Sequence, residues 1–462
     1  MCDIIIEMTK ITCGSPLLPS LPQARKDTDS MKAIFQNAMV YSKGEFKKQD
    51  MLFDGSSISV IEGGVFSSAD YSIFQNTVIL PGFCDAHVHF REPGFSYKET
   101  IKSGSLAAAH GGYTAVMTMP NLKPTPDSKE NLKVQLDIIA KDAEIAVLPY
   151  GTITVGEAGG TLSDMAGMAD DVVGFSDDGR GVQNSEMMQE AMRKAKSLGK
   201  PIVAHCEDNS LLFGGYIHDG EYAKLHGHRG ICSASEYAQV IRDIELVKET
   251  GCKYHVCHVS TKESVEAIRE AKRSGVDISC ETGPHYLVFD DSQLEEHGRF
   301  KMNPPIREKA DRDALIEGLL DGTVDMIATD HAPHSAEEKS RGLEKSAMGV
   351  VGLETSFAVL YTHLVLTGKM SLSKLVEVMS ENPRRRFDIK TDPGFTVFEL
   401  SEEYRIDPNE FLSMGKATPF ENMKVYGKCL ATVYGGKAVY ISDKLKKIDT
   451  QKERIKQNGK EN

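Results

Sequence analysis

The stretch Phe83-Cys-Asp-Ala-His-Val-His-Phe-Arg91 follows the apolar run Val78-Ile-Leu80 and the turn-forming pair Pro81-Gly82. We interpret it as the end of a buried β-strand. Side chains at i and i+2 of a strand point to the same face, so His87 and His89 would present two imidazoles to one space. Two such nitrogen donors suit Zn²⁺ at a site that leaves a position open for water. A His-x-His pair also arises by chance, so the metal hypothesis depends on further ligands elsewhere in the chain.

The composition is that of a globular protein, and the length predicts more than one structural unit. Its 462 residues are 40% hydrophobic and 26% charged, and it has no continuous apolar run of about 18 residues that would span a membrane. The net charge of −13 disfavours nucleic-acid binding and, without a convincing secretory leader, predicts a cytoplasmic protein. Nine cysteines without a C-x-x-C pair indicate reduced thiols. We expect Cys206 and Cys257 to be buried packing residues, because each is adjacent in sequence to a histidine, His205 or His258, and adjacent strand residues point to opposite faces.

Short β-prone runs at both ends of the chain predict one small β domain, built from residues 31–81 and 390–445. The runs are 33–41, 57–61 and 77–80 at one end, and 395–400, 423–426 and 431–440 at the other. The pair Gly435-Gly436 indicates a hairpin. Residues 1–30 form an N-terminal extension for which disorder is one interpretation, and residues 446–462 form a charged, solvated tail.

Between these flanks, residues 82–389 alternate strand-like and helix-like segments, with residues 185–198 and 262–274 among the expected helices. The candidate strands are 78–83, 114–119, 144–154, 172–175, 201–205, 253–258, 277–281 and 325–329. Eight strands separated by helices predict an α/β fold of the (β/α)₈ TIM-barrel type, whose chemistry lies at the C-terminal ends of the strands. A doubly wound open sheet is the alternative, but no Gly-x-Gly-x-x-Gly follows an early strand to support it.

Residues that commonly bind metals follow or end several of these candidate strands. They are Asp177, Asp178, His205, His258 and Asp330. Each alone could be an ordinary hydrogen-bonded polar residue. Together with His87 and His89 they supply the donors of a mononuclear or binuclear hydrolytic site, in which a carboxylate can bridge two cations.

Seven motifs extend this pattern along the chain. They are Asp85-Ala-His-Val-His-Phe-Arg-Glu-Pro-Gly94, Met119-Pro-Asn121, Phe175-Ser-Asp-Asp-Gly179, His205-Cys-Glu-Asp208, Cys257-His-Val-Ser260, Met302-Asn-Pro-Pro305 and Thr329-Asp-His-Ala-Pro-His334. With these motifs the sequence resembles the metal-dependent amidohydrolases, and among them the class I dihydroorotases. The resemblance spans residues 31–440, and His-Phe-Arg-Glu-Pro-Gly is its most specific part.

The resemblance implies Zn²⁺, one or two ions per subunit. The implied ligands are His87, His89 and Asp330 on one side and His205 and His258 on the other. The bridging carboxylate falls on Asp178, with Asp177 as the alternative. Relatives such as hydantoinases and allantoinases often bridge with a carboxylated lysine, whereas the matching segment here offers two aspartates and no lysine. This difference favours the dihydroorotases.

The implied activity is that of a hydrolase of cyclic amides, which interconverts N-carbamoyl-L-aspartate and (S)-dihydroorotate in pyrimidine (UMP) biosynthesis. A metal-activated water would attack the ring amide carbon, with Asp330 as the general base. The guanidinium of Arg91 offers a planar fork for the carboxylate of the substrate. The implied substrate-binding residues are Arg91, Asn121, Asn303, His334 and, through the main chain, Met348 and Gly349.

Two segments depart from the family pattern, although no ligand position is lost. Relatives usually carry Pro-Phe-Gly where this chain has Ala347-Met-Gly-Val-Val-Gly-Leu-Glu-Thr355, and Thr282-Gly-Pro-His-Tyr286 replaces a commoner Pro-His-His pattern. The remaining histidines have more ordinary interpretations. We expect His255 to pack or to support a ligand, His285 and His331 to donate hydrogen bonds to ligands, and His218, His226 and His228 to lie in surface loops.

Two other functions stay open at this point. One is another cyclic amidase, such as a hydantoinase or an allantoinase. The other is a non-catalytic scaffold that binds an aspartate transcarbamoylase. We expect a homodimer with a small-molecule substrate and with no nucleic-acid or membrane partner, and a complex with aspartate transcarbamoylase is a further hypothesis.

Overall fold

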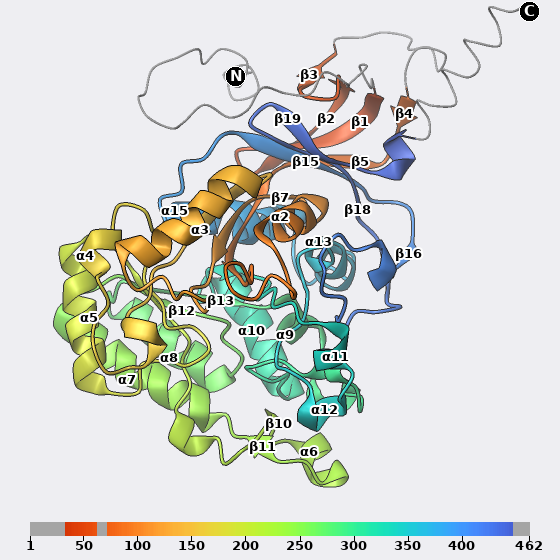
Figure 1. The fold of residues 1–462 in the computed structure, drawn as a ribbon. Coiled ribbons are helices and arrows are strands. Elements are labelled where there is room, and N and C mark those ends of the chain that lie inside the picture. Colours follow the sequence, from red (N-terminus) through yellow and green to blue (C-terminus); the bar gives the residue numbers. More distant parts are fainter. Residues whose placement is uncertain (1–32, 62–71, 447–462) are drawn as a thin grey trace, which may run out of the picture.

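The computed structural model describes residues 33–61 and 72–446. The predicted extension, residues 1–30, and all but the first residue of the predicted tail, 446–462, lie outside the described residues. Figure 1 shows a β-rich layer formed by both flanks of the described chain, at the top of the view, above a larger body of strands and helices. Within the described ranges, no helix combines the length and the apolar character needed to cross a membrane.

One eight-stranded sheet joins the two flanks in the order β19-β18-β15-β5-β1-β2-β3, with β4 paired to β1. Its strands are β1 (Ala33–Ser42), β2 (Glu45–Phe53), β3 (Ile58–Val60), β4 (Ser72–Phe74), β5 (Thr77–Pro81), β15 (Gly394–Glu399), β18 (Lys428–Tyr434) and β19 (Lys437–Ile441). The flanks meet where β15 runs antiparallel to β5, with Phe395 opposite Pro81. The division of the chain into domains 31–81 plus 390–445 and 82–389 stays a prediction.

Two details of this sheet differ from the sequence analysis. The prediction that residues 423–426 belong to it is wrong, because β17 (Lys424–Val425) pairs with β16 (Tyr404–Arg405) in a separate sheet. Strand β2 was missed, since its first half is charged and only its end is buried. The hairpin at Gly435-Gly436 is confirmed, with φ of 55° and 72°, a region that glycine adopts without strain.

Parallel strands form the body below this sheet. They are β6 (Phe83–Val88), β7 (Tyr113–Thr118) and β8 (Ala146–Pro149) in one sheet, and β9 (Ile202–Ala204), β12 (Tyr254–Val256), β13 (Ile278–Thr282) and β14 (Met326–Ile327) in another. Isolated parallel bridges link the sheets through Phe175, which pairs with Gly151 and Ile202, and through His331, which pairs with Val88. The α/β class is therefore confirmed, with a curled parallel sheet as its centre.

Two predicted strands of the body are wrong. The run 78–83 is not one strand, because the chain changes sheets at Gly82 and β6 begins only at Phe83. A Cβ at Gly82 would lie 2.2 Å from Cγ2 of Thr114, so this crossing requires glycine. The run 172–175 contributes only the bridge at Phe175. The other six are found with shifted or shorter bounds.

Helices separate the parallel strands and cover the sheet from outside (Figure 1). The longer ones are α2 (Ile101–His110), α3 (Lys129–Asp142), α5 (Ser185–Ser197), α7 (Ala234–Thr250), α8 (Lys262–Arg273) and α10 (Lys309–Asp321). The shorter ones are α4 (Met165–Met168), α6 (Glu221–His226), α9 (Pro284–Val288), α11 (Ala336–Lys339), α12 (Gly342–Lys345), α13 (Ser356–Leu360), α14 (Leu372–Val376) and α15 (Asn382–Arg386). The predicted helices 185–198 and 262–274 are confirmed, each ending one residue earlier.

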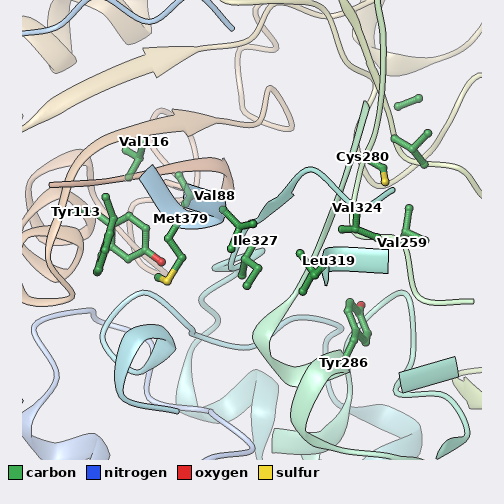
Figure 2. Packing of buried hydrophobic residues seen from close by; sticks show 14 of the residues in the cluster. Val88, Tyr113, Val116, Val259, Cys280, Tyr286, Leu319, Val324, Ile327 and Met379 are labelled. Carbon is green, nitrogen blue, oxygen red and sulfur yellow. The ribbon is translucent and has the colours of Figure 1, made fainter. Parts of the chain in front are cut away.

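Apolar side chains fill the space between the strands and these helices. Figure 2 shows Val88 and Tyr113 of the parallel strands beside Met379, with Ile327 of β14 nearby. Phe83, at the start of β6, stacks on Phe357 and Phe398 with ring centroids 5.6 and 5.7 Å apart. Since Phe398 belongs to β15, this contact ties the flank sheet to the body and anchors the strand that carries His87.

Candidate metal centre and binding cavity

The six predicted metal ligands meet at the C-terminal edge of the parallel strands. They are His87, His89, Asp178, His205, His258 and Asp330, and none is more than 6% exposed. His87 lies in β6, and the others follow β6, the bridge at Phe175, β9, β12 and β14. His258 and Asp330 have positive φ, 34° and 47°. Such strained backbone in non-glycine residues is typical of functional sites.

The first group of donors surrounds one side of the Asp178 carboxylate. Nε2 of His87 lies 3.4 Å from Oδ1 of Asp178 and 3.5 Å from Oδ1 of Asp330. Nε2 of His89 lies 3.4 Å from Oδ2 of Asp178 and 3.1 Å from Oδ1 of Asp330. One donor atom from each of His87, His89 and Asp330 falls within 4.8 Å of the others, a spacing that could hold a metal ion.

The second group, His205 and His258, approaches the same carboxylate at the oxygen that also faces His87. Oδ1 of Asp178 is 3.6 Å from Nε2 of His258 and 3.8 Å from Nδ1 of His205. These two ring nitrogens are 2.9 Å apart. Asp178 thus lies within 4 Å of all four histidines, as a carboxylate shared by two cations would.

Two properties of the side chains support a bound cation at this site. Nε2 of His87 and Oδ1 of Asp178 are buried and have no hydrogen-bond partner among the described residues. A buried polar atom without a partner is costly, and a metal ion would satisfy both atoms. Burial raises the pKa of Asp178, but the imidazoles of His87 and His258 outweigh it and hold that pKa well below its usual range. The carboxylate is therefore available as an anionic ligand.

The structure separates the two neighbouring aspartates. Asp177 turns away from the histidines and accepts hydrogen bonds from the main-chain N–H groups of Ile153, at 2.8 Å, and Thr154, at 3.0 Å, and from the hydroxyl of Thr154. Asp178 alone faces the four histidines. The choice of Asp178 over Asp177 as the shared carboxylate therefore has a geometric basis.

One residue of the site was missed by sequence reasoning. The buried carboxylate of Glu281, in β13, lies 2.8 Å from Nδ1 of His87 and 3.1 Å from Nε2 of His255. Burial raises its pKa, but hydrogen bonds with His255 and His87 bring that pKa to about 2. Glu281 ends the predicted strand 277–281, so its place in the sequence was a usable signal. The expectation that His255 supports a ligand agrees with its contact to Glu281.

A cavity of about 330 Å³ opens beside the histidines, lined in part by Arg91, Asn121 and Asp178. Arg91 is almost buried and its Nε donates to the carbonyl oxygen of Pro333 at 3.3 Å. Oδ1 of Asn121 lies 3.0 Å from Nδ1 of His89. This contact places the His89 proton on Nδ1 and leaves Nε2 free to bind a metal.

His334 adjoins this cavity through Arg91, which lies 3.5 Å from it. Burial and the charges of Arg91 and Lys98 lower the pKa of His334 to about 3, so its imidazole is neutral. Its Nε2 then donates to the carbonyl oxygen of Met348 at 2.7 Å, and its Nδ1 accepts from Lys98 at 3.2 Å.

The other predicted substrate-binding residues already make contacts within the protein. Nδ2 of Asn303 donates to Glu207 at 3.0 Å, whereas its buried Oδ1 has no partner in the described part of the chain. The N–H of Gly349 donates to the carbonyl oxygen of Lys301 at 3.0 Å. A ring contact through residues 348–349 therefore stays a prediction.

The structure also places other histidines and the two cysteines whose surroundings were predicted from the sequence. The prediction for His218 is wrong: it is buried in β10 (Ile217–His218), where Nδ1 accepts from Arg307 at 3.3 Å. His226 is exposed as predicted and His228 is half-buried. The ring of His331 meets the N–H groups of Gly352 and Leu353 rather than a ligand. Cys206 and Cys257 are buried, as predicted.

The fold has solved counterparts. The chain superposes on an L-hydantoinase (dihydropyrimidinase) from Arthrobacter aurescens with a TM-score of 0.75 and 25% identity, covering 88% of this chain and 96% of that one. A dihydropyrimidinase from Brevibacillus agri matches with a TM-score of 0.73 and 21% identity, over 89% of this chain and 95% of that one. These similarities establish an amidohydrolase-type fold.

Sequence comparison identifies the family within this fold class. A family model described as dihydro-orotase-like matches residues 76–264. A dihydroorotase from Fusobacterium nucleatum is 48% identical over 417 residues, 88% of this chain and 98% of that protein. Another from Bacillus licheniformis is 45% identical over 428 residues, 90% and 100% of the two chains. The chain belongs to the dihydroorotase family.

Proposed function

We propose that this protein is a zinc-dependent class I dihydroorotase, which closes N-carbamoyl-L-aspartate to (S)-dihydroorotate and water, and reverses that reaction, in pyrimidine biosynthesis. The observation that carries the proposal is the position of Asp178, which lies close to both histidine pairs and, with Arg91, lines the same cavity. Family membership sets the reaction type, and the contacts of individual side chains assign the roles below.

One or two zinc ions fit the donor set. His87, His89 and Asp330 would hold one ion, His205 and His258 the second, and Asp178 would be shared. Histidine and carboxylate donors in a partly open site are those of hydrolytic zinc centres. Zinc held there supplies Lewis acidity, which polarises a carbonyl and makes water a nucleophile near neutral pH.

Asp330 is the proposed general base and general acid. Burial opposes its ionisation, but the nearby imidazoles of His89 and His87 keep the pKa of Asp330 below its usual range. It is therefore ionised and able to accept a proton from the attacking water. In the hydrolytic direction it passes this proton to the leaving ring nitrogen, and in the biosynthetic direction the transfers reverse.

Arg91 is the proposed carboxylate-binding residue. Its guanidinium is nearly buried and lines the cavity, and its planar shape would suit a carboxylate. Asn121 shares the cavity wall, and His334 and Asn303 approach from neighbouring loops. An anionic ring is favoured over the neutral ring of a hydantoin because Arg91 forms no ion pair within the described ranges and would face a neutral ring without a counter-ion.

The finer description of the fold is part of the proposal. We propose that the parallel strands close into a (β/α)₈ barrel, supported by the order of their pairings and by the bridges at Phe175 and His331. A composite β domain from the two flanks would accompany it. A homodimer, a cytoplasmic location and a complex with aspartate transcarbamoylase are supported only by the family resemblance.

The test is metal analysis combined with turnover. Purified protein should contain one or two zinc ions per chain and should interconvert dihydroorotate and N-carbamoyl-L-aspartate. Chelation should abolish turnover and added zinc should restore it, while Asp330→Asn should stay inactive with metal present. Metal-loaded protein that turns over hydantoin or allantoin but not dihydroorotate would contradict the proposal. Protein that binds an aspartate transcarbamoylase without any turnover would favour the scaffold role instead.

A further inference from the structure

Lys339, the last residue of α11, carries a buried amine with an unusual set of partners. It is 4% exposed, and within the described ranges it forms no ion pair with a carboxylate. Its Nζ donates instead to three main-chain carbonyl oxygens, those of Lys301 at 3.0 Å, Ala347 at 2.8 Å and Gly349 at 2.6 Å. An ammonium has three N–H donors, and here all three are used.

Burial of this amine is costly. Burial and the nearby charge of Lys301 lower the pKa of Lys339 to about 7. A buried cation without a counter-ion persists only where other dipoles compensate it, and the three carbonyl oxygens provide that compensation. In the described part of the chain, the three hydrogen bonds of this costly group all join it to two loops.

The two loops that Lys339 joins carry predicted substrate-binding residues. The carbonyl of Lys301 lies two residues before Asn303, and those of Ala347 and Gly349 flank Met348. A hydrogen bond from the N–H of Gly349 to the carbonyl oxygen of Lys301 reinforces the same junction. Lys339 thus sets the position of the two loops relative to each other.

The junction also abuts His334 with little free space. Gly349 has φ of 129°, and a Cβ there would lie 2.7 Å from the carbonyl oxygen of Ala332 and 3.1 Å from Nε2 of His334. His334 in turn donates to the carbonyl oxygen of Met348. In such close packing, a shift of one loop displaces the other, since there is no gap to absorb it.

We propose that Lys339 is a positioning residue for substrate binding: its ammonium fixes the loop at 301–303 against the loop at 347–349, so that Asn303 and the main chain beside Met348 meet the substrate together. The inference rests on the proposed function. It assigns Lys339 to binding and not to the chemical step, because its hydrogen bonds go to main-chain carbonyl oxygens rather than to the metal ligands.

The test compares Lys339→Met with wild type. Methionine keeps a long apolar stem but removes all three donors. We expect the KM for dihydroorotate to rise about tenfold or more, the change that loss of hydrogen bonds from a charged group produces. We expect kcat to change little and zinc content to stay the same.

Amide hydrogen exchange of peptides covering 301–304 and 346–350 should become faster. Lys339→Gln, a second variant, should raise KM in the same direction.

Lys200→Met is the matched control. Lys200 also donates to a main-chain carbonyl, that of Val172 at 2.7 Å, but it precedes β9 at the opposite end of the strands. It should leave the KM and the exchange of both peptides unchanged. If wild type is active and Lys339→Met or Lys339→Gln keeps its KM, or loses zinc or kcat instead, the Lys339 inference is wrong while the proposed function stands. An inactive wild type contradicts the proposed function, and the inference with it.

Discussion

Oε1 of Glu281 lies 2.8 Å from Nδ1 of His87, and both side chains are almost fully buried. A carboxylate can only accept, so Nδ1 of His87 carries the proton and Nε2 is directed at Asp178 and Asp330. The other oxygen of Glu281 is held by His255 at 3.1 Å. This carboxylate therefore fixes both the tautomer and the orientation of a proposed metal ligand, as partners of metal-binding histidines commonly do.

Replacement of Glu281 should weaken metal binding. In Glu281→Gln the charge that raises the basicity of His87 is lost, and we expect about a 10–100-fold lower affinity for zinc. Competition with a chromophoric chelator measures it without reference to turnover. Asp243→Asn is a suitable control, because Asp243 is another buried carboxylate, which accepts from the hydroxyl of Tyr254 at 2.5 Å away from the histidines. Wild-type affinity in Glu281→Gln would show that Glu281 has no such role.

The adjacent aspartates should give opposite results. Asp178→Asn removes the carboxylate close to both histidine pairs, so zinc content should fall and turnover should be lost. Asp177→Asn leaves those pairs intact but weakens the hydrogen bonds to Ile153 and Thr154, so we expect a loss of stability of about 1–3 kcal/mol with zinc retained. Zinc analysis and denaturant unfolding of both variants check this. Retention of zinc in Asp178→Asn with loss in Asp177→Asn would reverse the assignment.

That the proposed ligands meet was predictable because parallel strands bring their C-terminal ends together. Once β-rich and helical segments alternate, a histidine after one strand and an aspartate after another must share an edge, however far apart they are in sequence. His205 and Asp330 were found in this way. The same rule covers Glu281, the penultimate residue of β13, but strand-end position alone does not say which ligand a side chain supports.

Other features depend on contacts that a sequence pattern does not contain. The strand-like run at 78–83 gives no sign in the sequence that the chain changes sheets at Gly82. The reason for glycine there is the close approach of Thr114, which only the structure shows. Along an unbroken strand, His255 and His258 are three residues apart and would point to opposite faces. In fact β12 ends at Val256 and His258 has positive φ, so the alternation stops before it and both histidines approach His87 or its partner Glu281. His218 is buried in contact with Arg307, which is 89 positions further along the sequence.

The buried His218 predicts a loss of stability in acid. Burial and the charge of Arg307 lower its pKa to about 3 from an ordinary value of 6.5. Between these two values the unfolded chain binds a proton that the folded chain does not, so the free energy of unfolding falls as pH falls. From pH 7 to pH 5 this site should cost about 2 kcal/mol.

Substitution isolates this contribution. His218→Asn keeps a hydrogen-bond acceptor for Arg307 but cannot take up a proton. Between pH 7 and pH 5, the fall in its free energy of unfolding should therefore be smaller than that of wild type by about 2 kcal/mol. Urea unfolding at both pH values measures the difference. The exposed His226→Asn should follow wild type. Parallel pH dependence in His218→Asn and wild type would exclude this role for His218.

Arg91 is the proposed carboxylate-binding residue, and its replacement should separate substrate binding from metal content. In Arg91→Gln the paired N–H donors and the charge are lost from a nearly buried position. Loss of one partner of a buried charge pair costs about 2–5 kcal/mol, so kcat/KM for dihydroorotate should fall at least about 30-fold, chiefly through a higher KM. Zinc content should stay at the wild-type value.

The choice of substrate makes this variant diagnostic. Hydantoin has no carboxylate, so any residual turnover of hydantoin should be indifferent to Arg91→Gln, and dihydroorotate should lose its advantage. Arg269→Gln is the control, because Arg269 pairs with Glu266 and Asp321 on the surface helix α8 and its neighbour. If Arg91→Gln leaves the KM for dihydroorotate unchanged, Arg91 does not bind the carboxylate, and the selectivity of the cavity must come from other residues on its wall.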